Sequence, residues 1–184
     1  MILGLDISTS CTGWCVIDDS GKLIDMGHIL LTREKTFFDK AQRVKYALSE
    51  ININYDISKI FIEENLQAFR PGFSSAKTLL TLARFNGVVT YISQLEFLND
   101  PQFINVNAAR KELGIKITSK KNGGKPTKEQ ILCWVTENLN NVNHKWPTKI
   151  LKSGPRKNQQ ILESFCYDMA DAYVIALAGL SMNT

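Results

Sequence analysis

The stretch Met1-Ile-Leu-Gly-Leu-Asp6-Ile-Ser-Thr-Ser-Cys-Thr-Gly13-Trp-Cys15 decides the fold. Its opening apolar run suits a central β-strand that is covered on both faces. Asp6 interrupts that run at its far end, where a buried charge is costly unless something compensates it. A polar turn follows, and we expect Gly13 to supply flexibility before the chain resumes a strand at 14–17. Asp6 is therefore either a turn residue that bonds nearby amides or a ligand of a metal ion or metal-bound phosphate.

Length and composition are those of an ordinary globular protein. The chain has 184 residues, of which 44% are hydrophobic and 22% charged, and this fits one domain with a full core. We predict a single domain over residues 1–184. No apolar run is long enough to cross a bilayer and no signal peptide is recognised, so we expect a cytoplasmic protein without a membrane partner. The four cysteines lack zinc-site spacing and are expected to be reduced.

The basic residues are concentrated in one part of the chain. Residues 107–160 contain twelve Lys or Arg and three Asp or Glu, whereas the remainder contains ten basic and fifteen acidic residues. Such segregation is typical of a nucleic-acid-binding surface, although a solvated lysine-rich face gives the same pattern. Two basic loop regions are predicted within it, 114–126 and 140–160, and Trp146 is expected to be exposed in the second.

Periodicity and turn signals predict an α/β fold. We expect a five-stranded mixed sheet, in which a three-stranded meander is followed by parallel strands, flanked by helices. Thr36 with Asp39, and Thr127 with Gln130, predict capping boxes at the starts of two helices. The predicted strands are 2–5, 14–17, 22–31, 59–65 and 103–106, and the predicted helices are 36–51, 74–96, 108–113, 127–139 and 163–180.

Further acids lie at two other places that this fold brings toward Asp6. Glu63 and Glu64 end the strand that begins at Lys59, and sites in α/β sheets form at that end of the strands. Asp168 and Asp171 lie three residues apart on one face of the last helix, which is otherwise apolar. Each feature alone has a simple explanation, as a solvated rim or a helix-dipole contact. Four acids at the edge of one sheet would repel one another unless divalent cations lie among them.

These blocks together resemble a known family. Ile-Leu-Gly-Leu-Asp6 with Thr12-Gly13-Trp, Ile62-Glu63, and Asp168-Met-Ala-Asp171-Ala are similar to the four acidic blocks of RuvC-type Holliday junction resolvases, in the RNase H-like superfamily. The long helix near 75–88 and the basic segment from Asn107 to Lys128 also resemble that family. The family glutamate directly follows an isoleucine, which favours Glu63 over Glu64. The 140–160 loop is longer than in compact bacterial members, and the DNA-stacking aromatic is not clearly matched, with Phe69 the nearby candidate.

The resemblance implies a homodimeric endonuclease that resolves four-way DNA junctions by paired symmetric cuts, in a bacterial or phage-infected cell. It implies two Mg²⁺ ions in each site, for which Mn²⁺ substitutes, held by Asp6, Glu63, Asp168 and Asp171. Our hypothesis for the roles gives Asp6 both metals, Asp171 the metal that activates water, and Glu63 and Asp168 the metal at the leaving oxygen. The predicted DNA-binding residues are Arg110, Lys111, Lys120, Lys121, Lys125, Lys128 and Phe69.

Three other functions stay open on the sequence. An RNase H-like nuclease acting on RNA or on other branched DNA would use the same acids. An actin-like or sugar-kinase ATP-binding domain also begins with Gly-x-Asp-x-Ser/Thr, but it needs two such domains and does not predict the acidic pair on the last helix. A non-catalytic nucleic-acid-binding module would leave the acids unexplained, because carboxylates oppose phosphate binding when no metal is present.

Overall fold

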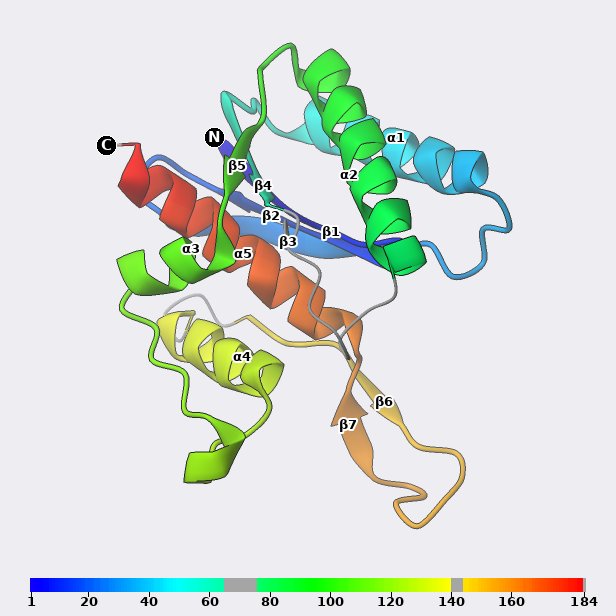
Figure 1. Ribbon diagram of the computed structural model, residues 1–184, viewed down its shortest axis with the longest axis vertical. Coiled ribbons are helices and arrows are strands. Elements are labelled where there is room, and N and C mark those ends of the chain that lie inside the picture. Colours follow the sequence, from blue (N-terminus) through cyan, green and yellow to red (C-terminus); the bar gives the residue numbers. More distant parts are fainter. Residues whose placement is uncertain (65–75, 140–143, 184) are drawn as a thin grey trace.

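The computed structural model describes residues 1–64, 76–139 and 144–183, and its centre is a five-stranded mixed sheet (Figure 1). The strand order is β3-β2-β1-β4-β5; β1 pairs antiparallel with β2 and parallel with β4, and β4 pairs parallel with β5. The predicted meander followed by parallel strands is therefore confirmed. The strands are β1 (Ile2–Ile7), β2 (Cys11–Ile17), β3 (Leu23–Leu30), β4 (Lys59–Glu63) and β5 (Gln102–Ile104).

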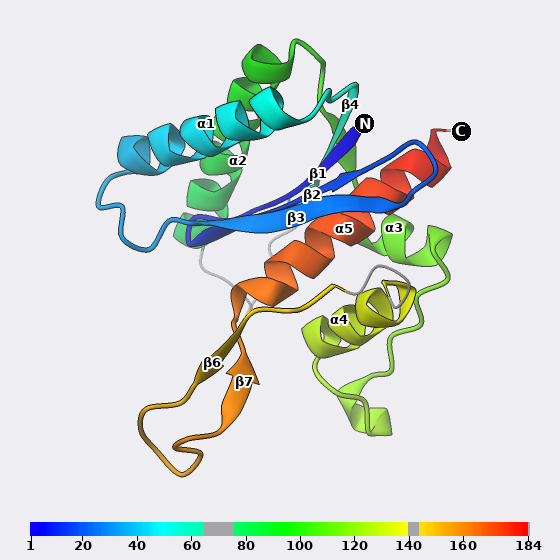
Figure 2. The same cartoon turned by 180° about the vertical axis from the view of Figure 1, so that it is seen from behind.

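Helices cover both faces of the sheet. Figure 2 shows α1 and α2 on one face and α5 on the other, with α3 and α4 lying beyond α5. α5 is long and apolar enough to cross a membrane by length and composition, and its apolar character is explained by its place between the sheet and these two helices. The helices are α1 (Phe37–Asn54), α2 (Ala76–Phe97), α3 (Val106–Glu112), α4 (Thr127–Asn138) and α5 (Phe165–Met182), with a 3₁₀ turn at Lys120–Asn122.

Two glycines allow α5 to lie unusually close to the sheet. A side chain at Gly4 would meet the backbone carbonyl of Ala172 and the methyl group of Ala176, and one at Gly13 would meet the backbone carbonyl of Asp168. Gly13 lies within β2, opposite Asp6. The expectation that Gly13 gives flexibility before the strand is therefore wrong, because this residue is needed for close packing.

Only one of the two predicted capping boxes forms. At α1, the Thr36 side chain accepts a hydrogen bond from the backbone of Asp39, whose carboxylate accepts one from Thr36 in return. At α4, Pro126 occupies the cap position and no side chain caps the helix. The Gln130 side chain bonds the backbone of Thr118 and the carbonyl of Lys125 instead. These bonds tie the 114–126 segment to α4.

The region 140–160, predicted as a loop, contains a β-hairpin over its described part, which begins at 144. β6 (Thr148–Ile150) pairs antiparallel with β7 (Gln160–Leu162). Trp146, predicted to be exposed, is half-buried, and its indole nitrogen donates a hydrogen bond to the Thr136 hydroxyl of α4 at 2.9 Å. The prediction failed because each strand has only three residues and little apolar alternation.

Candidate active site

Asp6 and Glu63 lie side by side on the face of the sheet that α5 covers. Alternate side chains of a strand point to opposite faces, and the parallel register pairs Leu5 with Ile62, one position before the two acids. Ile2 and Phe61 belong to the core under α5, whereas Leu5 and Ile62 belong to the core under α1 and α2. The pleat therefore brings both carboxylates toward α5.

Glu64, the alternative to Glu63, is directed elsewhere. Its carboxylate accepts a hydrogen bond at 3.1 Å from the side-chain amide of Asn105, the N-cap residue of α3, and its backbone amide bonds the carbonyl of Ile104. Like Glu63, it borders the cavity that lies at this end of the sheet. The structure thus groups Glu63, rather than Glu64, with Asp6.

α5 supplies the other two predicted acids, and α4 supplies a cation. Asp168 lies in the first turn of α5, and its carboxylate is 3.5 Å from the ammonium group of Lys128 at the start of α4. Asp168 is 18% exposed and Lys128 61%, so water screens the pair and its contribution to stability is small. Asp171 lies one turn further along, inside α5 and past its first turn, so a helix-dipole role does not account for it.

The pKa values show that the acids share one electrostatic environment. Burial, and then the charges of Glu63, Asp171 and Asp168, raise the pKa of Asp6 well above its usual value. Burial raises the pKa of Glu63 to about 7, with Asp171 adding to the shift and Arg110 and Lys128 opposing it. Burial also raises the pKa of Asp171 to about 6, against the attraction of Lys128 and Arg110.

The same acids stabilise the charged form of Lys128. Burial alone would lower the pKa of its ammonium group, but Asp168, Asp171 and Asp6 together raise it. Lys128 therefore carries its positive charge firmly beside the carboxylates. Arg110, on α3, is close enough to affect both Glu63 and Asp171, and its Nε atom is buried without a hydrogen-bond partner in the described part of the chain.

The carboxylates border a cavity of about 320 Å³ between the sheet end, α2, α4 and α5. Asp6, Glu63 and Asp168 line it together with Lys128 and Asn86. Asn86 is 3% exposed, and its amide donates a long hydrogen bond of 3.5 Å to the Glu63 carbonyl. Sequence reasoning missed Asn86, because a polar residue inside an apolar helix gives a signal only once the helix face that meets the site is known.

The donor set fits a hard divalent cation. Carboxylate oxygens are the ligands that Mg²⁺ takes in proteins, and a cation would relieve the repulsion that the raised pKa values of Asp6 and Glu63 report. Over residues 1–64, 76–139 and 144–183, no three Asp, Glu, His or Cys side chains already converge into a ready-made metal site. The residues that would hold Mg²⁺ are Asp6, Glu63, Asp168 and Asp171.

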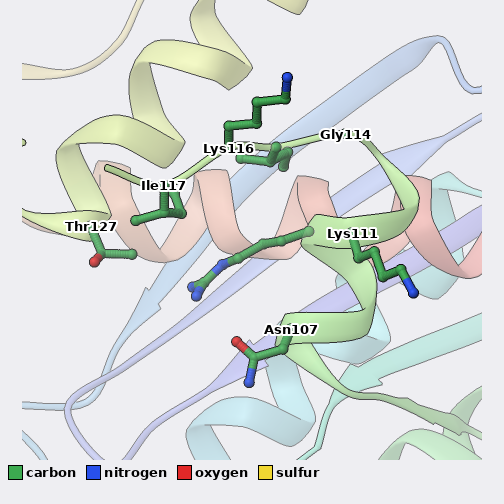
Figure 3. Close-up of a pocket in the computed structure, with 8 residues that line it drawn as sticks. Asn107, Lys111, Gly114, Lys116, Ile117 and Thr127 are labelled. Carbon is green, nitrogen blue, oxygen red and sulfur yellow. The ribbon is translucent and has the colours of Figure 1, made fainter. Parts of the chain in front are cut away.

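A wider basic groove of about 590 Å³ adjoins this site (Figure 3). Figure 3 shows Asn107 on α3 and Thr127 at the start of α4 on either side of the hollow, while the side chains of Lys111 and Lys116 extend outward from its rim. Arg110 lines the groove as well and so connects it to the carboxylates. Among the other predicted DNA-binding residues, Phe69 lies outside the described residues, and the exposed ones near α4 are Lys120, Lys121 and Lys125.

Comparison with solved structures shows which fold surrounds this site. RuvC of T. thermophilus, solved in complex with a Holliday junction substrate, superposes with a TM-score of 0.66 over 99% of this chain and 93% of its own, at 16% sequence identity. The chain has the fold of RuvC-type Holliday junction resolvases. A second Thermus thermophilus RuvC structure gives a TM-score of 0.62 at 18% identity, covering 99% of this chain and 94% of that one.

A eukaryotic resolvase is also similar in structure to this chain. The yeast mitochondrial Holliday junction resolvase Ydc2 superposes with a TM-score of 0.54 at 13% identity, over 98% of this chain and 77% of that one. No protein-family model matches the sequence. No curated protein matches it either. The RNase H-like fold predicted from the acidic blocks is therefore confirmed through three-dimensional structure rather than through sequence similarity.

Proposed function

We propose that this chain is a metal-dependent endonuclease that resolves four-way DNA junctions. The observation that carries the proposal is the grouping of Asp6, Glu63, Asp168 and Asp171 at one end of the sheet, beside Lys128 and Arg110. Buried acids that raise one another's pKa destabilise the fold, and such arrangements are typical of functional sites. The likeness to RuvC structures, one of them bound to a Holliday junction, supports this substrate class.

Mg²⁺ is the proposed cofactor, with Mn²⁺ as a substitute. Two such ions held by these carboxylates would lower the pKa of a bound water and stabilise charge on the leaving oxygen. The four acids would hold and orient the metal, while the ammonium group of Lys128 keeps a positive charge 3.5 Å from the carboxylate of Asp168. Lys128 and Arg110 are placed to neutralise the phosphate that undergoes cleavage and to hold it against the sheet end.

The basic groove offers a path by which DNA would reach the acids. A cluster of carboxylates repels a phosphate backbone, so binding requires cations on the approach to the site. Arg110 and Lys111 line the groove between α3 and α4, and Lys116 extends from its rim. We propose that this groove holds one DNA strand beside the scissile phosphate. Because paired cuts across a junction must be symmetric, the active form is proposed to be a two-fold homodimer.

Cleavage assays with matched substrates test the proposal. A labelled four-way junction, a linear duplex and an RNA–DNA hybrid are incubated with Mg²⁺ or with EDTA, using the wild type and Asp6→Asn. We expect paired symmetric nicks in the junction alone, lost with EDTA and reduced at least about 1,000-fold by Asp6→Asn, because that acid is central to the metal site. Asp19→Asn, in the exposed turn before β3, serves as the charge-matched control and should cut normally.

Other outcomes favour other functions. Cleavage of the hybrid or of RNA would support the proposed metal site but show that the substrate is not a four-way DNA junction. Binding of DNA without any Mg²⁺-dependent cleavage would favour a non-catalytic module. An increase in melting temperature on addition of ATP, without cleavage, would favour an actin-like or sugar-kinase ATP-binding domain, whose first strand carries the same motif.

A further inference from the structure

The β6–β7 hairpin projects from the body of the protein as a separate arm (Figures 1 and 2). It lies beside the N-terminal end of α5, the end that carries Asp168. Nearly all residues from Thr148 to Leu162 are exposed, and neither strand pairs with the main sheet. None of the residues of the proposed catalytic site lies on this arm. We therefore considered a separate role for the arm.

The arm is strongly basic. Residues 148–162 contain four Lys or Arg and no Asp or Glu. Lys149, on the stem, is paired at 2.9 Å with Glu163 at the base. The tip carries the exposed residues Lys152, Arg156 and Lys157, and within the described part of the chain none of the three forms an ion pair. These three charges are therefore available to an anionic partner.

The tip is held in one conformation by its own backbone. Asn158 donates a hydrogen bond to the carbonyl of Leu151 at 2.8 Å, and Leu151 donates one to the carbonyl of Gln159 at 3.0 Å. Lys157 bonds the carbonyl of Gly154 at 3.0 Å. Gly154 and Asn158 adopt the left-handed backbone that this turn needs, with φ of 81° and 67°. A preformed tip loses little conformational entropy when it binds.

The base of the arm is fastened to both α4 and α5. Trp146 bonds Thr136 of α4, while the Pro147 carbonyl accepts bonds from the backbone of Glu163 and from the thiol of Cys166 in the first turn of α5. Asp168 follows Cys166 by two residues. The arm is thus rigidly positioned relative to a proposed metal-binding residue.

We propose that this hairpin binds the phosphate backbone of a duplex arm of the junction, away from the point of cleavage. The inference rests on the proposed function and extends it to a second DNA contact. The six residues from Thr148 to Ser153 reach roughly 20 Å at about 3.3 Å per residue, which corresponds to about six base pairs along a duplex. A two-stranded ribbon also has the width that the major groove of DNA accepts.

Charge and area favour DNA over a protein partner. The stem exposes only two large apolar side chains, Ile150 at 63% and Leu162 at 37%. These supply a small part of the roughly 800 Å² that each partner buries in a stable protein interface. Three unpaired cations at a rigid tip instead suit phosphates, whose binding releases counterions.

The test neutralises the tip and measures DNA affinity without cleavage. The triple variant Lys152→Ala, Arg156→Ala, Lys157→Ala is titrated against a junction and a linear duplex in EDTA at several salt concentrations. We expect at least about tenfold weaker binding of both at moderate salt, and a slope of log K against log salt that is smaller in magnitude by about 2 to 3, one unit per lost phosphate contact. Hydroxyl-radical footprinting on the junction should lose protection about six nucleotides from the cleavage position.

A matched triple variant controls for net charge. Lys22→Ala, Lys45→Ala, Lys59→Ala removes three exposed charges at the opposite end of the sheet and on α1, and it should bind within about twofold of the wild type. Lys152→Arg with Lys157→Arg should retain wild-type affinity, which separates lost charge from misfolding. If the tip variant binds like the control, or its footprint is unchanged, the proposal is overturned.

The outcome is independent of whether the protein cuts junctions. Weaker duplex and junction binding by the tip variant, in a protein that cuts nothing, would support the arm and overturn the proposed function. If the tip variant cleaves junctions normally and binds DNA as tightly as the wild type, the proposed function would be supported and the role of the arm overturned.

Discussion

At the scale of single residues, the cost of assembling the acids predicts how stability depends on pH. The pKa is raised to about 6 at Asp171 and to about 7 at Glu63, so the metal-free folded state holds these protons more tightly than the unfolded chain does. The contribution of these two groups to the free energy of unfolding should therefore be highest below about pH 4, fall as pH rises toward 7, and stay low above it. Asp171→Asn should raise metal-free stability by about 3 kcal/mol near pH 8.

Thermal unfolding in EDTA at a series of pH values measures this effect. Asp171→Asn should gain melting temperature near pH 8 and little near about pH 3.5, while Mg²⁺-dependent cleavage is lost. Asp19→Asn, exposed in a turn, should show no gain at either pH. A large loss of stability in Asp171→Asn at both pH values would show instead that this carboxylate makes a structural hydrogen bond that the fold requires.

At the scale of elements, the contact between β2 and α5 sets the position of Asp168. A methyl group at Gly13 would collide with the Asp168 backbone carbonyl, so Gly13→Ala must push the first turn of α5 away from the sheet. We expect a loss of about 2 kcal/mol or more in the free energy of unfolding, measured by urea titration, and cleavage lowered by at least about tenfold.

Gly87→Ala is the control for this substitution. Gly87 lies within α2, and among the described residues no atom apart from the neighbouring backbone of its own helix lies within 4 Å of the place where its side chain would be. Because alanine favours helix, Gly87→Ala should raise the free energy of unfolding by about 0.5–1 kcal/mol. Equal effects of the two substitutions would show that contact with α5 is not what requires glycine at position 13.

The elements also show what sequence can and cannot predict. The capping box at Thr36 was predictable, since both partners lie within three residues of each other. The same pattern at Thr127 failed because Gln130 bonds Thr118, which lies twelve residues away. The sequence could indicate Asp6 as a candidate site residue, because an acid at the end of an apolar strand is unusual. It could not indicate the role of Gly13, because that role depends on a contact with Asp168, far away in the sequence. The β6–β7 hairpin was missed because its strands are short and polar.

At the scale of the whole molecule, an exposed apolar stripe on α2 offers a surface for the proposed dimer. Leu80, Tyr91 and Leu95 are 65%, 63% and 53% exposed, and their spacing places them on one face of the helix with Gly87. Tyr91→Arg should convert the dimer to a monomer in analytical ultracentrifugation. Paired junction cuts should then become single, uncoupled nicks, because the second site is no longer present.

Tyr46→Arg on α1 tests whether the effect is specific. This tyrosine is 59% exposed, so the substitution makes the same change in charge and size on a different helix. The oligomeric state should not change. A wild-type protein that sediments as a monomer at all concentrations would contradict the proposed dimer.

The packing of α5 against β1 and β2 affects the order in which the protein folds. The proposed metal site joins Asp6 to Asp171, and the packing joins Gly4 to Ala172, so both depend on contacts between segments about 165 residues apart in the chain. Contacts of such long range form late, since the entropy of closing the large loop must be overcome first. Intermediates in which only the β1–β3 meander and α1 have formed therefore lack the acidic site, and the proposed nuclease activity should arise only in molecules that have completed folding.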